Sequence, residues 1–284
     1  HGWHDWYLSA NHNNGNDLSN HLLSGLNPVG VPKDLENTVF PFTYNQIDEL
    51  EELVKKHDIG VIKMEVVRST GPKNNFLQKV RDLANQKGII LIFDECTSGF
   101  RENFGGLHMK YNVEPDIAMF GKAMGNGYAI TSVIGRRKIM DAAQSTFISS
   151  TFWTERIGPS AALKTLEVME REKSWEKITN TGVQISNIWK KLAKKHRLPL
   201  VTFGLPALIK MKFECEFNLE YKTIITQEML KRGYLASNTV YVCTEHKQEI
   251  IDEYEKALDE VFSIIGECVQ GKPVSEILEG PVCY

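Results

Sequence analysis

The sequence predicts an α/β fold, in which a mostly parallel sheet with helices on both faces forms a large domain and a smaller α+β domain follows. Residues 60–94 show the order strand, helix, strand with short connections, which is typical of a right-handed crossover between parallel strands. Beyond residue 197 the pattern changes to a shorter mixture of strands and helices. We therefore divide the 284 residues into a large domain, residues 1–197, and a small C-terminal domain, residues 198–284.

The first forty residues are rich in Asn, His, Gly and Ser and show no sustained period, which predicts a long loop. The aromatic residues Trp3, Trp6 and Tyr7 are its expected anchors. Residues 43–46 have the form of a capping box, so a helix is expected to begin there and to run to about His57. Its apolar residues recur at helical spacing: Ile47, Leu50, Leu53 and Val54.

The central elements follow in short alternation. Residues 60–67 are expected to form a buried strand, residues 75–87 a helix that a glycine ends, and residues 89–94 the next strand. Two further short apolar runs, residues 117–120 and 129–134, are expected to add strands to the same sheet. Because parallel strands are buried on both faces, this sheet should be covered on each side.

The pattern of expected helices and strands changes in the last third of the large domain and again in the small domain. Long helices are expected past residues 158–159. In the small domain we expect a strand at 208–213, a helix at 220–232, a strand at 240–243 and a helix at 248–265.

Composition excludes several classes of protein. With 42% hydrophobic and 24% charged residues, the chain is neither disordered nor collagen-like nor a coiled coil. Thirty-three basic and 36 acidic residues give a net charge of −3, which argues against a nucleic-acid partner. The longest apolar run, residues 89–93, is far shorter than the roughly 20 residues that cross a bilayer, so no membrane partner is expected.

The cysteines and histidines point to neither a metal nor a disulfide framework. The five cysteines are scattered without a C-x-x-C pair, which favours a reducing cytoplasm. His1, His4 and His12 lack the spacing of metal ligands, and no metal is predicted. Since the chain begins at His1 rather than Met, we expect it to be a piece of a longer protein.

Polar residues follow three of the apolar runs, at positions where open α/β sheets bind ligands. They are Asp94, Lys122 and the hydroxyl cluster at 149–151. Together they suit pyridoxal phosphate (PLP), which needs a lysine for its Schiff base, a carboxylate facing the pyridine nitrogen and donors for its phosphate. The alternative is that Lys122 only forms a salt bridge at a surface turn.

Three stretches, residues 91–101, 115–117 and 120–127, closely resemble the class III PLP-dependent aminotransferases. Within them the chain is most similar to the glutamate-1-semialdehyde aminomutase branch. The resemblance covers nearly the whole chain and implies a fold-type I enzyme, a small-molecule amino or keto substrate, and a homodimer with shared active sites. It also places His1 and Gly2 in the family's cofactor-binding loop.

The resemblance implies a role for each matching residue. Lys122 would be the Schiff-base lysine and proton shuttle, and Asp94 would hold the pyridine nitrogen. Cys96 would lie against the ring face, and Glu65 would lie near the ring. Thr151 would bind the phosphate of the neighbouring subunit's cofactor.

The chain also departs from the family. The loop that cups the cofactor phosphate would precede His1, and residues 152–159 replace the turn that commonly follows Thr151. We therefore expect PLP-dependent amino transfer, either between molecules or within one as in the aminomutase. The alternatives are a transaminase for a sugar or polysaccharide precursor, and a noncatalytic fragment or interaction protein that retains the fold.

Overall fold

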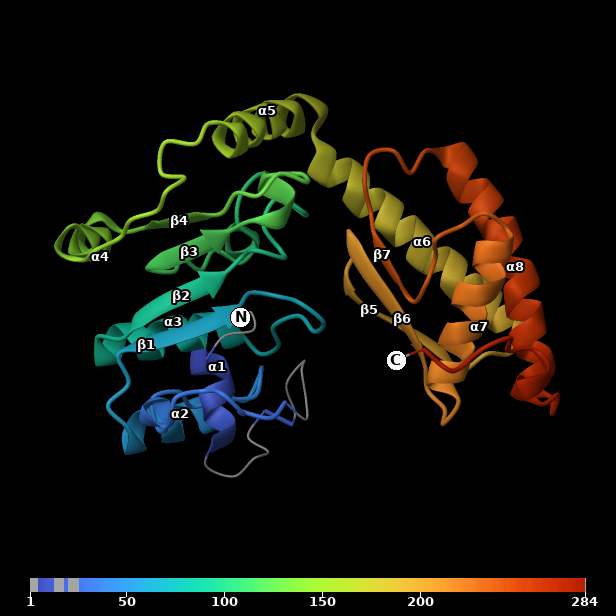
Figure 1. The fold of residues 1–284 in the computed structure, drawn as a ribbon, viewed down its shortest axis with the longest axis horizontal. Helices are drawn as coiled ribbons and strands as arrows, with labels where there is room; N and C mark the ends of the chain where they lie inside the picture. Colours follow the sequence, from blue (N-terminus) through green and yellow to red (C-terminus); the bar gives the residue numbers. More distant parts are fainter. Residues whose placement is uncertain (1–4, 13–17, 20–25, 284) are drawn as a thin grey trace.

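The computed structural model describes residues 5–12, 18–19 and 26–283. His1 and Gly2, two of the predicted site residues, lie outside them. In the described part a four-stranded sheet, β1–β4, and a three-stranded sheet, β5–β7, form two units that the long helix α6 joins (Figure 1).

The larger sheet has the strand order β1-β2-β3-β4. β1 (Val61–Glu65), β2 (Ile90–Asp94) and β3 (Ile117–Phe120) are parallel, and β4 (Ser132–Gly135) pairs with β3 antiparallel. The prediction of a mostly parallel sheet is confirmed. The crossover helix α3 (Phe76–Lys87) ends at Gly88, which has a φ of 68° and so takes the left-handed conformation that favours glycine.

The two faces of this sheet differ in burial. Ile62 and Met64 of β1 and Leu91 and Phe93 of β2 pack against α3 in one core. Alternate strand residues point to the opposite face, where Lys63, Ile90, Ile92, Ile117 and Met119 are only half-buried. The structure thus shows α3 on one face, and helices on the second face stay a prediction.

Asp116 fastens the amino-terminal end of β3. It is 6% exposed, and its Oδ2 accepts hydrogen bonds from the backbone N–H of Leu91 and from Nη1 of Arg81, both at 2.8 Å. Arg136 lies 3.2 Å from its Oδ1. Burial raises the pKa of Asp116, but these hydrogen bonds and the two guanidinium groups outweigh it, so the pKa is lowered.

The N-terminal region is more ordered than the sequence pattern predicts. It holds a short helix α1 (Asp5–Ser9), followed by the 3-10 helices η1 (Ala10–His12) and η2 (Lys33–Leu35). The prediction of a long loop is therefore wrong for these residues. Trp6 is 60% exposed and does not anchor the segment, whereas Leu8 is buried.

Helix α2 (Ile47–Lys56) begins later than the predicted capping box. Asn45 takes a φ of 70°, so the helix cannot include it. Its side chain instead donates to Gly71 O at 3.1 Å and accepts from Lys73 N at 2.9 Å. The capping-box assignment was wrong because this asparagine ties down a distant loop.

A run of helices connects the two units. Beyond β4 come α4 (Arg137–Met140), η5 (Asp141–Ser145), α5 (Ile157–Glu172) and α6 (Ser174–His196). Pro159 lies in the first turn of α5, where its missing N–H removes no intrahelical hydrogen bond. Figure 1 shows α5 above the β4 edge and α6 leading to the C-terminal unit.

The C-terminal unit is an antiparallel sheet with helices against it. Its strands are β5 (Leu200–Leu205), β6 (Leu208–Phe213) and β7 (Thr239–Tyr241), and its helices are α7 (Asn218–Lys231) and α8 (Gln248–Val269). A short 3-10 helix η6 (Val274–Glu276) follows. The sequence analysis missed β5.

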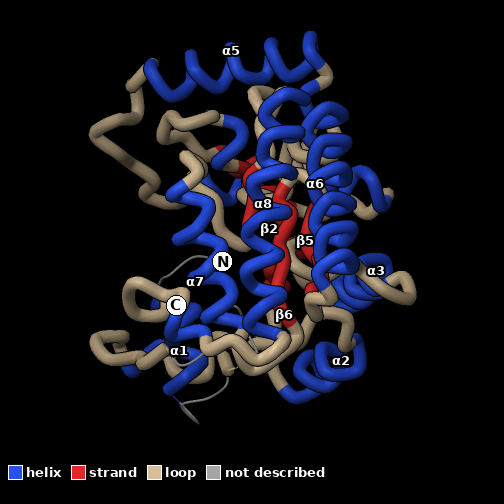
Figure 2. Tube along the Cα trace, turned by 90° about the vertical axis from the view of Figure 1, so that its right-hand side faces the viewer, coloured by secondary structure: helices blue, strands red, loops and turns tan. Residues whose placement is uncertain are grey.

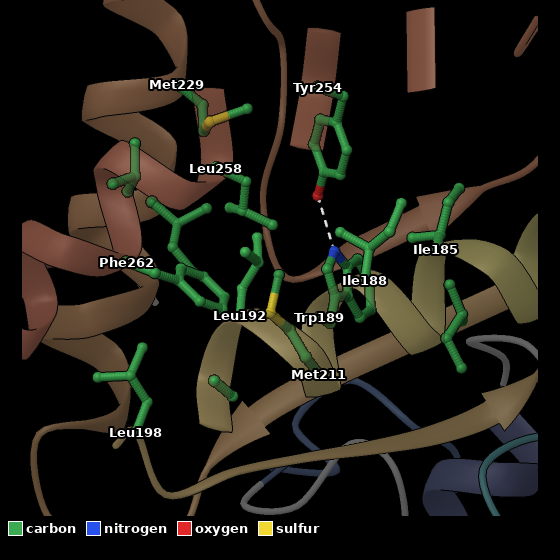
Figure 3. Close-up of a cluster of buried hydrophobic side chains, with 14 of the residues drawn as sticks. Ile185, Ile188, Trp189, Leu192, Leu198, Met211, Met229, Tyr254, Leu258 and Phe262 are labelled. Atoms are coloured by element: carbon green, nitrogen blue, oxygen red, sulfur yellow. Dashed lines mark hydrogen bonds between the residues drawn. The ribbon is translucent and has the colours of Figure 1, made fainter. Parts of the chain in front are cut away.

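Helix α6 belongs to the same core as these strands and helices. Ile185, Trp189 and Leu192 of α6 pack with Met211 of β6 and Phe262 of α8, and Trp189 Nε1 donates to Tyr254 Oη at 2.8 Å (Figure 3). Figure 2 shows α6 and α8 side by side over β5 and β6. The boundary between residues 197 and 198 stays a prediction, and this packing supports placing it before α6.

Across the described ranges no helix is long and apolar enough to cross a membrane. His, Cys, Asp and Glu side chains in the same ranges form no group of three or more that could hold a metal ion.

Candidate active site

The carboxyl ends of three parallel strands bring the predicted residues to one edge of the sheet. Glu65, the last residue of β1, pairs in register with Asp94, the last residue of β2. Asp94 in turn pairs with Met119 of β3. Paired residues of neighbouring strands point to the same face, so Glu65 and Asp94 share the half-buried face of the sheet.

Asp94 is held in place by its neighbours. It is 7% exposed, its Oδ1 accepts from the backbone N–H of Cys96 at 3.1 Å, and its Oδ2 lies 3.7 Å from Nζ of Lys63. A buried carboxylate needs such partners to remain favourable in the fold. Its orientation is therefore fixed by the strand on one side and by the following turn on the other.

The next residue, Glu95, points into the opposite core and fastens the loop after β2. It is fully buried. Its Oε1 lies 2.9 Å from both the backbone nitrogen and Nδ1 of His108, and Ser98 Oγ donates to its Oε2. Three hydrogen bonds to one buried side chain hold the loop that follows Asp94.

Lys122 begins the short helix η4 (Lys122–Met124), directly after β3 and Gly121. Its φ of 43° is in the left-handed region. The side chain Nζ donates to Thr97 Oγ1 at 2.6 Å, so the loop after β2 contacts the lysine after β3. Gly125 permits the tight turn that follows, because a Cβ there would lie 2.2 Å from Tyr128 O.

Cys96 lies between the carboxylate and the lysine. A Cβ at Gly121 would be 3.5 Å from its Sγ. Burial raises the pKa of the Cys96 thiol and the Asp94 carboxylate raises it further, while Lys122 and Lys63 oppose the shift. The thiol therefore stays protonated at neutral pH and behaves as a small apolar side chain.

The amino-acid sequence of the chain was also compared with models of known protein families. Residues 29–239, more than half of the chain, match the model of the family described as aminotransferase class-III. The chain belongs to this family. The stated resemblance to class III aminotransferases is confirmed.

Individual relatives agree with this membership. The chain is 31% identical to the 3-aminobutyryl-CoA aminotransferase of Cloacimonas acidaminovorans, over 88% of this chain and 59% of that protein. It is 25% identical to the glutamate-1-semialdehyde 2,1-aminomutase of Persephonella marina, over 82% of this chain and 60% of that protein. The chain thus spans about three fifths of the length of these relatives.

Solved structures share the fold. An omega-transaminase from Sphaerobacter thermophilus superposes with a TM-score of 0.80 at 18% identity, covering 92% of this chain and 66% of that one. A protein described as a transaminase with PLP bound gives a TM-score of 0.79 at 20% identity, covering 94% and 66%. The fold-type I prediction for the chain is supported by both.

The remaining predicted residues of this member of the class-III family lie in different places. Glu65 is beside Asp94, and its Oε1 is 2.8 Å from Nη1 of Arg68. Thr151 lies in an exposed turn between η5 and α5, and no hydrogen bond of the described residues joins it to Lys122. His1 and Gly2 are outside the described ranges. The structure therefore brings together Lys122, Asp94, Cys96 and Glu65, and leaves Thr151 on the surface.

Sequence reasoning missed the residues that support these four. Thr97, Glu95 and His108 were not assigned roles, although the first two stand inside the stretch that carried the resemblance. A hydroxyl three residues after the strand-end aspartate was the available signal for Thr97. The role of His108 depends on a loop closing back on Glu95, which no local pattern reveals.

Proposed function

We propose that this chain carries the lysine and the carboxylate of a PLP-dependent amino-group transfer. The observation that carries the proposal is the placement of Asp94 at the end of β2 and of Lys122 directly after the adjacent parallel strand β3, in a chain of the class-III aminotransferase family. Lys122 would attach the cofactor, and Asp94 would hold its pyridine nitrogen.

The residues present fit this cofactor. The Asp94 carboxylate can accept the N–H of a protonated pyridine ring, because its position is already fixed by Cys96 and Lys63. Cys96 offers a protonated thiol to a ring face, and Glu65 Oε2 is a buried acceptor without a hydrogen-bond partner in the described structure. An amine, a carboxylate and an apolar contact are what the ring requires from a protein.

Bound PLP supplies an electron-accepting ring that eases bond breaking at the substrate carbon which carries the amino group. The protein supplies the proton transfer. Lys122 Nζ is the movable proton carrier, and the Thr97 hydroxyl at 2.6 Å orients it at the end of the sheet. The Asp94 carboxylate would stabilise the positive charge of a protonated ring nitrogen.

A borohydride experiment tests this assignment. With PLP added to the chain, reduction with borohydride should fix the cofactor to one tryptic peptide, the one containing Lys122. Lys122→Ala should abolish the labelling and lower turnover by more than the about 10²- to 10⁴-fold that loss of general acid–base catalysis costs. Arg137→Ala, in the exposed helix α4, is the matched control. A label on any other lysine would refute the assignment.

We infer that the substrate is a small amino compound, and that transfer occurs between molecules or within one. The relatives include both types, an aminotransferase and an aminomutase. Incubation of the loaded enzyme with an excess of an amino compound alone separates them, since without a separate acceptor an aminotransferase converts at most one equivalent per cofactor, whereas an aminomutase turns over repeatedly. The five unpaired cysteines support placing the protein in a reducing cytoplasm.

We further propose a homodimer in which Thr151 serves the partner's site. Aromatic side chains around it are exposed, Phe147 by 97%, Phe152 by 75% and Trp153 by 70%. Such a patch is typical of a protein–protein interface. Mixing unfolded Lys122→Ala and Thr151→Ala chains and refolding them should restore activity in mixed dimers, because one site then has an intact lysine and an intact threonine. If mixing restores no activity, the hypothesis that Thr151 serves the partner's site is refuted.

A further inference from the structure

Three charged side chains meet where the carboxyl end of β1 faces the C-terminal unit. Glu65 ends β1, Arg68 follows it by three residues, and Lys210 stands on β6. A Cβ at Gly204 of β5 would lie 3.6 Å from Arg68 O and 3.9 Å from Lys210 Cγ. The Arg68 backbone and the Lys210 side chain therefore lie beside the same glycine, and the Lys210 amine interacts electrostatically with both Arg68 and Glu65.

The contacts between the units support this placement. Leu205 of β5 and Leu208 of β6 are buried in the core that β1, β2 and α3 form. Figure 1 shows the loop that follows β1 reaching from the large sheet toward β5 and β6. The charged cluster thus borders a packed junction, one strand away from Asp94.

The hydrogen-bonding capacity of the cluster is not used up. Arg68 Nη1 bonds Glu65 Oε1 at 2.8 Å, but Arg68 Nε and Glu65 Oε2 are buried and have no hydrogen-bond partner within the described structure. A buried donor without a partner is unfavourable and invites a ligand that supplies one.

The charges of the cluster are also unbalanced. Arg68 and Lys210 are opposed by one carboxylate, Glu65, and the ion pairs of the described residues include none for Lys210. Burial lowers the pKa of the Lys210 amine, as does the charge of Arg68, while Glu65 opposes the shift. One more negative charge would relieve both cations.

We propose that Arg68 and Lys210 form a binding subsite for the carboxylate of the amino-group donor or acceptor. The inference rests on the proposed function, because the subsite is assigned to the substrate of the Lys122–Asp94 site. A guanidinium takes a planar carboxylate with two of its N–H groups, and Glu65 shows that this guanidinium already binds that chemistry.

The geometry also assigns the substrate's second feature. An incoming carboxylate that accepts from Arg68 Nε and from Lys210 Nζ leaves the bond between Arg68 and Glu65 intact. The free Oε2 of Glu65 then accepts an N–H or O–H group carried beside the carboxylate. The substrate class is therefore an acid with a nearby amino or hydroxyl group.

The test measures binding without turnover. Calorimetric titration of the 284-residue chain, without cofactor, with β-alanine and with its neutral amide should show binding of the carboxylate form only. Lys210→Met and Arg68→Gln should each weaken this binding about tenfold or more, since each removes a partly buried charged partner. Lys212→Met, an exposed lysine on the same strand and face, is the matched control and should leave it unchanged.

The outcomes separate the two proposals. If Lys210→Met and Arg68→Gln bind β-alanine as tightly as the parent chain, the subsite is overturned, even if borohydride labels Lys122. If Lys212→Met loses as much β-alanine affinity as Lys210→Met, the effect comes from net charge and the subsite is also overturned. Inorganic phosphate binding that depends on both cations, with no such dependence for β-alanine, overturns the carboxylate assignment. Should Arg68→Gln fail to fold, Lys210→Met and the conservative Arg68→Lys carry the same test.

Discussion

The two sheets of this molecule differ in how completely their faces are buried. In the C-terminal unit the apolar residues of the sheet and helices close into one core, and Trp189, Met211, Ile224 and Phe262 are completely buried. In the larger sheet only the face under α3 is closed. Leu91 is completely buried there, whereas its neighbour Ile92 points to a half-buried face.

The difference shows where the chain keeps residues available for chemistry. Parallel strands are normally covered on both faces, yet the half-buried face carries Lys63, Glu65 and Asp94. The buried carboxylate of the C-terminal unit, Glu228, instead lies near the end of helix α7, where it pairs with Lys231 and Arg232. Stability is concentrated in the closed cores, and the proposed chemistry lies on the face that packing leaves available.

The largest expected effect is on activity. It concerns Asp94 at the carboxyl end of β2, and its comparison is Asp116, the buried carboxylate at the amino-terminal end of the neighbouring strand β3. Asp94→Asn should lower the kcat of amino transfer about 10²- to 10⁴-fold, with little change in thermal unfolding, because a neutral amide keeps the shape but loses the charge. Asp94→Glu should recover part of the rate. Full activity in the Asn variant would show that this carboxylate does not face the cofactor.

The next effect is on stability and compares adjacent residues of β2 that point to opposite faces. Leu91→Ala should lower the free energy of unfolding by about 2 to 5 kcal/mol, because it leaves a cavity in a closed core. Ile92→Ala should cost about 1 kcal/mol, since its side chain is only half-buried. Urea unfolding measures both, and equal losses would mean that the two faces are equally covered.

A smaller effect on stability than that of Leu91→Ala concerns Asp116, the carboxylate at the amino-terminal end of β3. Asp116→Asn should cost about 1 to 3 kcal/mol at pH 7, through weaker bonds to Arg81 and Leu91, and should leave most activity. Because the folded state lowers the pKa of Asp116, its charge stabilises the fold above the unfolded pKa of about 3.9. That contribution is lost as pH falls through the lower folded value.

Unfolding curves of Asp116→Asn and the parent chain should therefore converge in acid. A stability difference that stays constant from pH 7 to strongly acidic conditions would contradict the assigned role of the Asp116 charge.

Local sequence patterns predicted the strands and helix that build the candidate site. The run at 89–94 and the helix at 75–87 agree closely with β2 and α3, because apolar period and a glycine stop act locally. The placement of Lys122 and Asp94 at neighbouring strand ends followed from the crossover order. The identities of these residues then carried the resemblance.

What the sequence did not reveal depends on contacts between distant segments. β5 was missed because Gly204 interrupts its apolar pattern, Pro199 and Pro206 flank it directly, and pairing with β6 stabilises it. The packing of α6 into the C-terminal core and the meeting of Arg68 with Lys210 both join segments far apart in the chain. Such contacts leave no periodic signal.

At Lys122 the demands of stability and of the proposed chemistry favour different residues. A lysine at a φ of 43° costs about 1 kcal/mol relative to glycine, which adopts this conformation freely. Laboratory evolution for heat resistance alone would therefore favour glycine at this position, and the survivors would keep the fold while losing the amine. In the proposed function, the amine that Lys122 supplies offsets this cost in stability.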